Sequence, residues 1–359
     1  MSNERKRLRD LGYQVGIIPP GELNLITDVP GVLVGHSTII EGEGKLIPGQ
    51  GPKRTGVTII KPHSGNAYRE KVRASAYVFN GYGKTTGLVQ VQELGNIESI
   101  IALTNTLNVP LVTDALIDYH IEENPDIGID TSTINVVVGE CHDGKLNDIQ
   151  GRHVKKEHVY EAIKNADKLF KEGSVGAGTG MSALGYKAGI GSSSRKIEDG
   201  DLTYHLGALV LSNFGMKGDL TILRKSIDKK DEVQEREKGS IIVILATDAP
   251  LNARQLYRLS KRAPLGISRT GSFGSHGSGD VIITFSTSNK LDHDNKDSLL
   301  VRAIVNEQTK LFRNLLRAVV ESTEEAILNS ILMAETVVGR DNNKSEAISI
   351  EKVKRKLSG

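Results

Sequence analysis

The feature that most limits how this chain can fold is a run of five aliphatic residues, 241–245, directly after Ser240. A strand that is apolar at every position, without polar alternation, needs other layers on both of its faces. Four more β-rich runs, each bounded by Gly, Asp, Pro or Ser, occur at residues 57–60, 134–138, 209–211 and 281–285. We therefore predict that the strand after Ser240 is a central strand and that other layers cover both of its faces.

Helices are predicted where apolar residues recur three and four positions apart, from Val159 to Phe170 and from Ser298 to about Ala334. Within the second stretch, Ser322 and Glu325 have the spacing of a capping box, which marks the start of a helix. We therefore expect two helices there, the second beginning at Ser322. Sheets with covering helices place the chain in the α/β class.

Residues 224–238 form the sharpest break in composition, because six basic and five acidic residues occur in these fifteen positions. So many charges cannot enter a core, and an exposed linker is predicted. The linker ends at Gly239 and Ser240, where the buried strand begins. A charged segment is ordinarily just solvated surface, and a Gly-Ser pair alone is a weak signal of chemistry.

An N-terminal serine would give this junction a specific chemistry. A serine hydroxyl is a weak nucleophile unless a base assists it, and a free α-amine, with a pKa of about 7.7 to 8.0, is such a base. Attack of the Ser240 hydroxyl on the Gly239 carbonyl would expose that amine through an ester that water hydrolyses. The preceding glycine offers little steric obstruction to this attack.

Six segments of the sequence occur together in one known family of enzymes. They are LITDVPGVLVGH at 25–36, NGYGKTTG at 80–87, GAGTGM at 176–181, LSNFG at 211–215, Gly239-Ser240 with ATDAPL at 246–251, and HGSGD at 276–280. Through them the chain resembles the L-aminopeptidase/D-esterase family, the self-processing β-aminopeptidases, which are N-terminal-nucleophile hydrolases. The resemblance covers most of the chain.

The resemblance implies an α/β/β/α four-layer sandwich in one domain, residues 1–359, self-cleaved into an α chain, 1–239, and a β chain, 240–359. It implies aminopeptidase, amidase or esterase action on small peptides, amides or esters, D- or β-amino acid substrates included, through an acyl-enzyme on Ser240. Ser278 and Asp280 match the pair that assists the amine and the hydroxyl, although some relatives carry Glu at the last position. A homotetramer of processed protomers is also implied.

Two further residues are candidates for contacts with substrate. Asn213 ends an apolar strand, where its amide could donate to a developing oxyanion, although an Asx turn is the more ordinary interpretation. Glu140 ends the predicted buried strand 134–139, and a buried carboxylate there needs a partner. A substrate ammonium and a salt bridge with Lys145 or Arg152 are equally compatible with the sequence.

Composition argues against several other classes of protein. Forty-six Lys and Arg against 44 Asp and Glu give a net charge of +2, which provides no footprint for nucleic acid or membrane. The single cysteine and the nine scattered histidines match no zinc pattern, so we expect no metal and no cofactor. With no run of eighteen apolar residues, a cytoplasmic location is predicted.

Two functions compete with the hydrolase. A self-processing acyltransferase of the ornithine acetyltransferase type is the alternative enzyme, but its nucleophile is usually Thr, so Ser240 favours hydrolysis. A binding protein that keeps only the fold is the third possibility. The joint presence of Ser240, Ser278, Asp280 and Asn213 argues against it.

Overall fold

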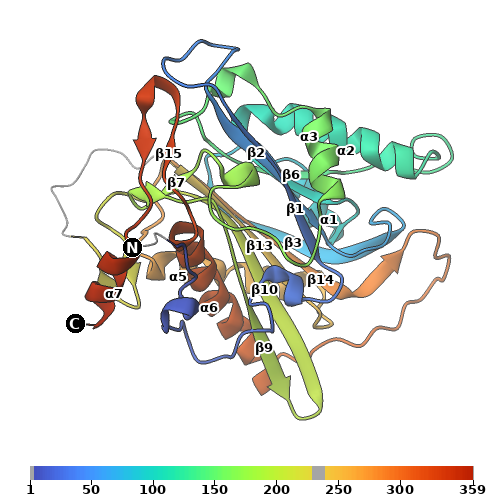
Figure 1. Cartoon of the computed structure of the whole chain (residues 1–359). Helices are drawn as coiled ribbons and strands as arrows, with labels where there is room; N and C mark the ends of the chain where they lie inside the picture. The colour runs from blue at the N-terminus through green and yellow to red at the C-terminus, as the bar shows by residue number, and fades with distance from the viewer. Residues whose placement is uncertain (1–3, 229–238, 359) are drawn as a thin grey trace.

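The computed structural model describes residues 4–228 and 239–358, arranged as two sheets packed face to face and covered by helices on both outer faces (Figure 1). One sheet has four strands in the order β1 (Leu33–Glu41), β2 (Lys53–Lys61), β5 (Ile101–Asn105) and β6 (Val137–Cys141). The other has six, in the order β4 (Asn96–Ile97), β3 (Glu70–Gly81), β14 (Ser278–Asp292), β13 (Gly239–Thr247), β10 (Leu202–Asn213) and β9 (Ile190–Asp199). Within these sheets the pairs β5–β6 and β13–β14 are parallel, and the others are antiparallel.

Separate helices cover the two sheets. Helices α2 (Val109–Glu123) and α3 (Lys156–Lys164) pack on the four-stranded sheet, at the upper right of Figure 1. Helices α4 (Ala253–Ser260) and α6 (Lys310–Leu332) pack on the six-stranded sheet, and α5 (Ala263–Arg269) packs on α6. The layers are therefore α/β/β/α, as the resemblance implies.

The position of strand β13 between two hydrophobic cores explains why its sequence is apolar at every position. Ile241, Val243 and Leu245 lie in the core shared with α4, α5 and α6. Ile242 and Ile244 lie in the core between the two sheets. Because successive side chains of a strand point to opposite faces, burial of both faces requires a continuous apolar run. The prediction of a central strand after Ser240 is confirmed.

Helix α6 differs from the two helices expected between Ser298 and Ala334. It is a single helix of 23 residues, and Ser322 lies in its interior. The Ser322 hydroxyl donates to the carbonyl of Ala318 at 2.7 Å, a bond made within a helix. Glu325 instead pairs with Arg195, whose Nη2 lies 2.8 Å from its carboxylate. The predicted capping box is wrong because both of its side chains have other partners.

Two other boundaries also differ from the sequence prediction. Helix α3 ends at Lys164, before Phe170. Strand β6 begins at Val137 rather than Ile134 and continues to Cys141, so Glu140 lies inside the strand instead of at its end.

Short elements complete the described part of the chain. They are the helices α1 (Leu88–Leu94) and α7 (Ile350–Ser358), the hairpins β7 (Ser182–Ala183) with β8 (Tyr186–Lys187), β11 (Thr221–Ile222) with β12 (Lys225–Ser226) and β15 (Val337–Val338) with β16 (Lys344–Ser345), and 3-10 turns at Arg9–Leu11, Ile26–Asp28, Thr106–Asn108, Ile149–Gly151, Gly176–Gly178 and Arg340–Asn342. Among the helices of residues 4–228 and 239–358, none is long and apolar enough to cross a membrane.

The predicted linker, 224–238, falls largely outside the described residues, because 229–238 are not among them. Its first five residues belong to the end of the β11–β12 hairpin. Arg224, Lys225 and Ser226 are exposed, as expected of a linker, whereas Ile227 is fully buried. Ile227 is therefore part of the core shared with α4, α5 and α6.

Candidate active site

The parallel pairing of β13 and β14 brings together residues that lie almost forty positions apart in sequence. In this register Gly239 is opposite Ser278, Ser240 is opposite Gly279, and Ile241 is opposite Asp280. On the other side of β13, the last residue of β10, Asn213, is opposite Ser240. Ser240, Ser278, Asp280 and Asn213 thus meet at one edge of the six-stranded sheet, where two parallel strands begin.

The hydroxyl of Ser240 lies against the peptide bond that precedes it. Its Oγ donates to the carbonyl oxygen of Gly239 at 2.7 Å, and the residue is only 5% exposed. A Cβ at Gly239 would lie 2.4 Å from the carbonyl oxygen of Asn213, so only glycine fits there. A Cβ at Gly279 would lie 3.0 Å from Ser240 Oγ and 2.4 Å from the carbonyl oxygen of Tyr82. The absence of side chains at Gly239 and Gly279 therefore allows β10 and β14 to lie close to the Ser240 hydroxyl on β13.

Ser278 and Asp280 form a buried hydrogen-bonded pair next to Ser240. Ser278 Oγ donates to Asp280 Oδ1 at 2.5 Å, and both residues are 2% exposed. Asn80, from β3, donates through Nδ2 to the other carboxylate oxygen at 2.9 Å. Burial raises the pKa of Asp280, and the hydrogen bonds from Ser278 and Asn80 oppose that rise. A carboxylate so placed can accept a proton that a serine hydroxyl passes on.

Both polar atoms of the Asn213 side chain have hydrogen-bond partners. Its Oδ1 accepts from the backbone N–H of Ser182 at 3.0 Å, and its Nδ2 donates to the carbonyl oxygen of His142 at 2.9 Å. An amide nitrogen carries two hydrogens, so one N–H remains for a further acceptor. The side chain thus does more than cap a turn, because its contacts reach β7 and the segment after β6.

Glu140 lies on the neighbouring sheet and is only 3% exposed. Its carboxylate accepts from the backbone N–H of Lys84 at 2.8 Å and from the hydroxyl of Thr106. No ion pair to Lys145, Arg152 or any other cation occurs for it among the described residues, and Arg152 Nε instead donates to Leu107 O at 3.2 Å. A buried carboxylate with hydrogen bonds but no counter-charge can accept a cationic ligand.

Gly83 lies between Glu140 and the residues around Ser240. These residues, Asn213, Gly239, Ser240, Ser278, Gly279 and Asp280, are called the Ser240 region. A Cβ at Gly83 would lie 3.3 Å from Glu140 Oε1 and 3.8 Å from the Cα of Gly279. Cys141, which follows Glu140, places its Sγ 3.3 Å from the carbonyl oxygen of Ser240. Gly83 therefore lies between the Glu140 carboxylate on one sheet and Gly279, the residue opposite Ser240, on the other.

Sequence reasoning assigned no role to Asn80 or Thr106, which bond Asp280 and Glu140. Asn80 begins the NGYGKTTG segment of the resemblance, and this was the one available signal for it. Thr106 follows β5, and its position became informative only when the parallel pairing of β5 and β6 put Thr104 opposite Glu140.

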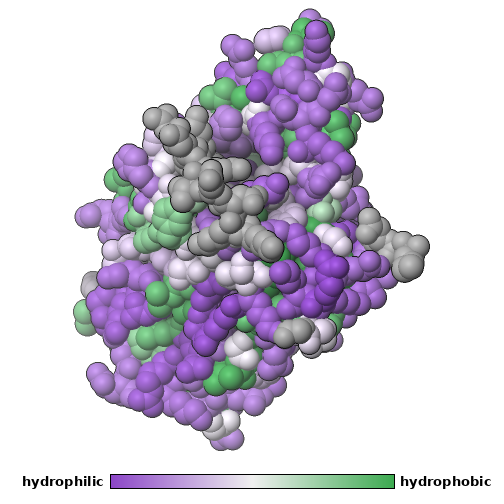
Figure 2. All heavy atoms as spheres, turned by 90° about the vertical axis from the view of Figure 1, so that its left-hand side faces the viewer, coloured by the Kyte–Doolittle hydropathy of each residue, from purple (hydrophilic) through white to green (hydrophobic). Residues whose placement is uncertain are grey.

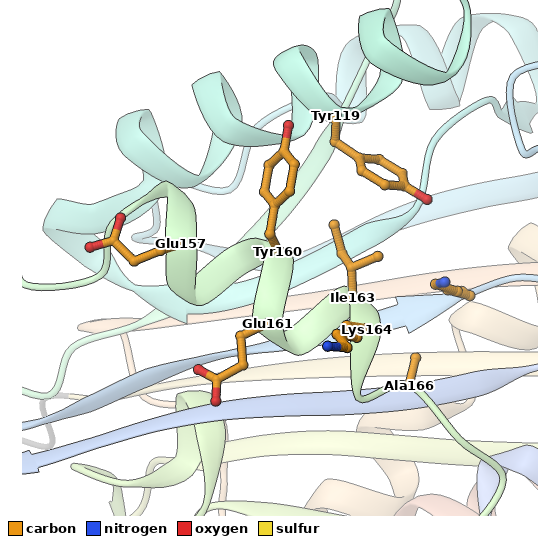
Figure 3. Close-up of a pocket in the computed structure, with 8 residues that line it drawn as sticks. Tyr119, Glu157, Tyr160, Glu161, Ile163, Lys164 and Ala166 are labelled. Carbon is orange, nitrogen blue, oxygen red and sulfur yellow. The ribbon is translucent and has the colours of Figure 1, made fainter.

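A hollow of the surface between α2 and α3 lies away from these residues. It has a volume of about 620 Å³ and is bordered by Tyr119 of α2 and by Tyr160, Glu161 and Lys164 of α3, as Figure 3 shows. None of its lining residues belongs to the Ser240 region. Within the described ranges, no group of three or more His, Cys, Asp or Glu is placed to hold a metal ion.

The sequence is similar to those of known peptidases. The family description "Peptidase family S58" matches residues 24–345. The beta-peptidyl aminopeptidase of Sphingosinicella xenopeptidilytica is 39% identical, and the match covers 97% of this chain and 90% of that protein.

Solved structures agree with the sequence match. A protein from Pyrococcus horikoshii is 50% identical, with a TM-score of 0.93 over 98% of this chain and 99% of that chain. The L-aminopeptidase D-Ala-esterase/amidase of Ochrobactrum anthropi, described as a prototype serine aminopeptidase with a variant of the Ntn hydrolase fold, is 36% identical, with a TM-score of 0.89 and 98% coverage of both chains.

Proposed function

The chain belongs to peptidase family S58 and has the Ntn hydrolase fold of its aminopeptidases, and we propose that it cleaves its own Gly239–Ser240 bond and then uses Ser240 as an N-terminal nucleophile. The observation that carries this proposal is the 2.7 Å contact between Ser240 Oγ and the Gly239 carbonyl oxygen. It places the hydroxyl beside the carbonyl that it would attack, at the start of a buried strand.

Self-cleavage begins when Ser240 Oγ attacks the carbonyl carbon of Gly239. The Oγ–C bond forms, the C–N bond between the two residues breaks, and the hydroxyl proton moves to the departing nitrogen of Ser240. Water then hydrolyses the ester, which leaves a carboxylate on Gly239 and a free amine and hydroxyl on Ser240. The freed amine can serve as the base for later turnovers.

In turnover, the Ser240 amine takes the hydroxyl proton while Oγ attacks the substrate carbonyl. Ser278, 2.5 Å from Asp280, is assigned to pass protons between the amine and the buried carboxylate. The free N–H of Asn213 is assigned to the oxyanion, because a fixed amide donor at that point stabilises developing charge. Water releases the acid from the acyl-enzyme.

Glu140 is assigned to the ammonium group of the substrate. Its burial without a counter-charge among the described residues supports this role over the salt bridge, because a fixed cation would have occupied the carboxylate. An ammonium held there would direct the first carbonyl of a peptide toward Ser240, which limits cleavage to N-terminal residues.

The substrates are proposed to be small peptides, amino-acid amides or esters, including those of D- or β-amino acids. This extends to the chain what the names of its relatives state, a beta-peptidyl aminopeptidase and an L-aminopeptidase D-Ala-esterase/amidase. Action in the cytoplasm as a homotetramer stays a prediction.

The mass of the purified protein tests self-cleavage directly. We expect two chains that end at Gly239 and begin at Ser240, and N-terminal sequencing of the smaller chain should start Ser-Ile-Ile. Ser240→Ala removes the attacking atom, so that variant should stay whole, soluble and inactive, whereas Ser240→Cys keeps a nucleophile and should be partly cut. A smaller chain that starts elsewhere, or hydrolysis of aminoacyl p-nitroanilides by Ser240→Ala at the wild-type rate, would refute the proposal.

A further inference from the structure

A second hollow, of about 550 Å³, lies between α5, α6 and the β11–β12 hairpin. No residue of the Ser240 region lines it, and its volume falls in the range of small-molecule sites. Its most distinctive lining is a set of four arginines: Arg224 of the hairpin, Arg262 and Arg269 at the two ends of α5, and Arg317 of α6.

The acidic residues of this hollow do not neutralise the four arginines. Glu321 is engaged by the backbone N–H groups of Ile17 and Ile18, at 3.2 and 3.1 Å, and by buried Arg195 at 3.3 Å. Glu324 is engaged by Arg269 at 3.3 Å. In the part of the chain that the structure describes, Arg224, Arg262 and Arg317 have no carboxylate partner.

Three guanidinium groups around one hollow repel one another unless an anion or water screens them. Guanidinium groups bind phosphate oxygens through pairs of parallel N–H donors, a geometry that ammonium groups cannot provide. The unpaired positive charge therefore matches an anion with several phosphate oxygens better than a single carboxylate.

The backbone of the β11–β12 turn, which borders the hollow, is strained. Its two central residues, Leu223 and Arg224, have φ of 50° and 66°. A two-residue turn with both φ angles positive normally contains Asn and Gly, and a bulky residue in that conformation is strained. Both strained residues line the hollow. Strain of this kind is kept where it serves a site, and here the turn brings a guanidinium to the hollow.

We propose that this hollow binds a small polyphosphate, an anion with two or three linked phosphate groups, through Arg224, Arg262 and Arg317. The apolar side chains of its wall, which would contact an organic group attached to the phosphates, are Ile17, Leu223, Leu316 and Val320. The proposal does not depend on the peptidase activity.

Calorimetric titration of the full-length protein with pyrophosphate and with tripolyphosphate at low ionic strength tests it. Binding should be measurable, should weaken as NaCl is added, and should weaken about tenfold or more in Arg262→Ala and in Arg317→Ala. Arg317→Lys keeps the charge but loses the paired donors, so its affinity should fall between those of the wild type and Arg317→Ala. ADP and ATP as further ligands distinguish a free polyphosphate from one that carries an organic group.

Arg313→Ala is the matched control, because Arg313 lies one turn earlier on α6 and does not line the hollow. It should bind pyrophosphate as the wild type does, and all variants should keep wild-type peptidase activity, which shows that they are folded. Absence of binding heat with every phosphate ligand, equal weakening by Arg313→Ala, or equally tight binding of citrate would each overturn the proposal.

Discussion

At the residue scale, the proposed chemistry of the site depends on hydroxyls that are buried rather than solvated. Ser240 and Ser278 are almost inaccessible, and each hydroxyl has one acceptor, the Gly239 carbonyl and the Asp280 carboxylate. A buried hydroxyl with a fixed partner loses little orientational freedom when it reacts. This favours reaction at one peptide bond only.

Ser278→Ala should slow both self-cleavage and turnover, by about 10²- to 10⁴-fold for turnover, because a positioned proton relay contributes about that much. The protein should stay folded, since loss of one satisfied hydroxyl costs only about 0.5 to 1.5 kcal/mol. Gel analysis of cleavage over time and the kcat for an aminoacyl p-nitroanilide measure the effect. Ser275→Ala is the control, because the Ser275 hydroxyl has no described hydrogen bond. Wild-type rates in Ser278→Ala would remove it from the site.

Asp143 should make the free energy of unfolding depend on pH. It is fully buried, burial raises its pKa to about 7, and the hydrogen bond from Asn147 opposes the rise. Between pH about 4 and 7 the unfolded chain loses this proton and the folded chain keeps it. The free energy of unfolding should therefore fall as pH rises through that window, by up to about 1.4 kcal/mol per pH unit.

Asp143→Asn removes this titration. Urea unfolding of the uncut Ser240→Ala protein, with and without Asp143→Asn, measures the difference in free energy of unfolding from pH 4 to 8. The stability of the protein that keeps Asp143, relative to the Asp143→Asn variant, should decline up to about pH 7 and then level off. A constant difference across this range would contradict a raised pKa.

At the element scale, the direction of strands decides where the site lies. Strands β13 and β14 are parallel, so their first residues share one edge of the sheet, and Ser240 falls opposite Gly279, between Ser278 and Asp280. An antiparallel pair would have placed Ser278 beside the far end of β13. The helices between them, α4 and α5, form the crossover that a parallel pair requires.

Gly239→Ala tests how closely β13 meets β10. The added methyl group would lie 2.4 Å from the carbonyl oxygen of Asn213 and 2.7 Å from the Cα of Phe214, and neither backbone atom can move easily. We expect a loss of about 1 to 3 kcal/mol in stability and slower self-cleavage, measured by intact mass over time. Gly81→Ala is the control, because a Cβ there has only an ordinary 3.7 Å contact with Val78. Unchanged cleavage in Gly239→Ala would mean that the strands can separate freely.

At the scale of the whole molecule, the six-stranded sheet interleaves the two expected chains. Strand β14 and all of β13 except its first residue, Gly239, come from Ser240 onward, and these strands lie between β3 and β10, which come from residues before Ser240. N-terminal residues also bind α6: Arg5 donates to the carbonyls of Leu332 and Ile331. Figure 2 shows apolar groups scattered over a mainly hydrophilic face. Cleavage between Gly239 and Ser240 would therefore be expected to leave one body rather than two fragments.

Light scattering after gel filtration tests whether the two chains stay together and how many protomers associate. The processed protein should elute with both chains in equal amounts, and its mass should be about four times that of one precursor chain if the tetramer implied by the resemblance forms. The exposed apolar side chains of Leu299 and Val301, 86% and 96% exposed, are consistent with contacts between copies. Loss of the smaller chain under native conditions would contradict the interleaved sheet, and the mass of a single protomer would contradict the tetramer.

The sequence by itself determined the central strand, because continuous apolarity at residues 241–245 requires burial on both faces. It also determined the family, because six segments occur in a fixed order. Local spacing failed for α6, where Ser322 and Glu325 look like the start of a helix until their tertiary partners, Ala318 and Arg195, are known.

Only the tertiary structure decided how the residues around Ser240 are arranged and which strands carry them to it. Asn80, Asn213 and Asp280 come from three different strands, and no local pattern states that these strands are neighbours. The environment of Glu140 was likewise open, since the sequence allowed a salt bridge and a substrate contact equally. Its partners became known only from the packing of β5 and β6 and of the segment after β3. Sequence patterns record what each segment needs to bury, whereas long-range packing determines which segments meet.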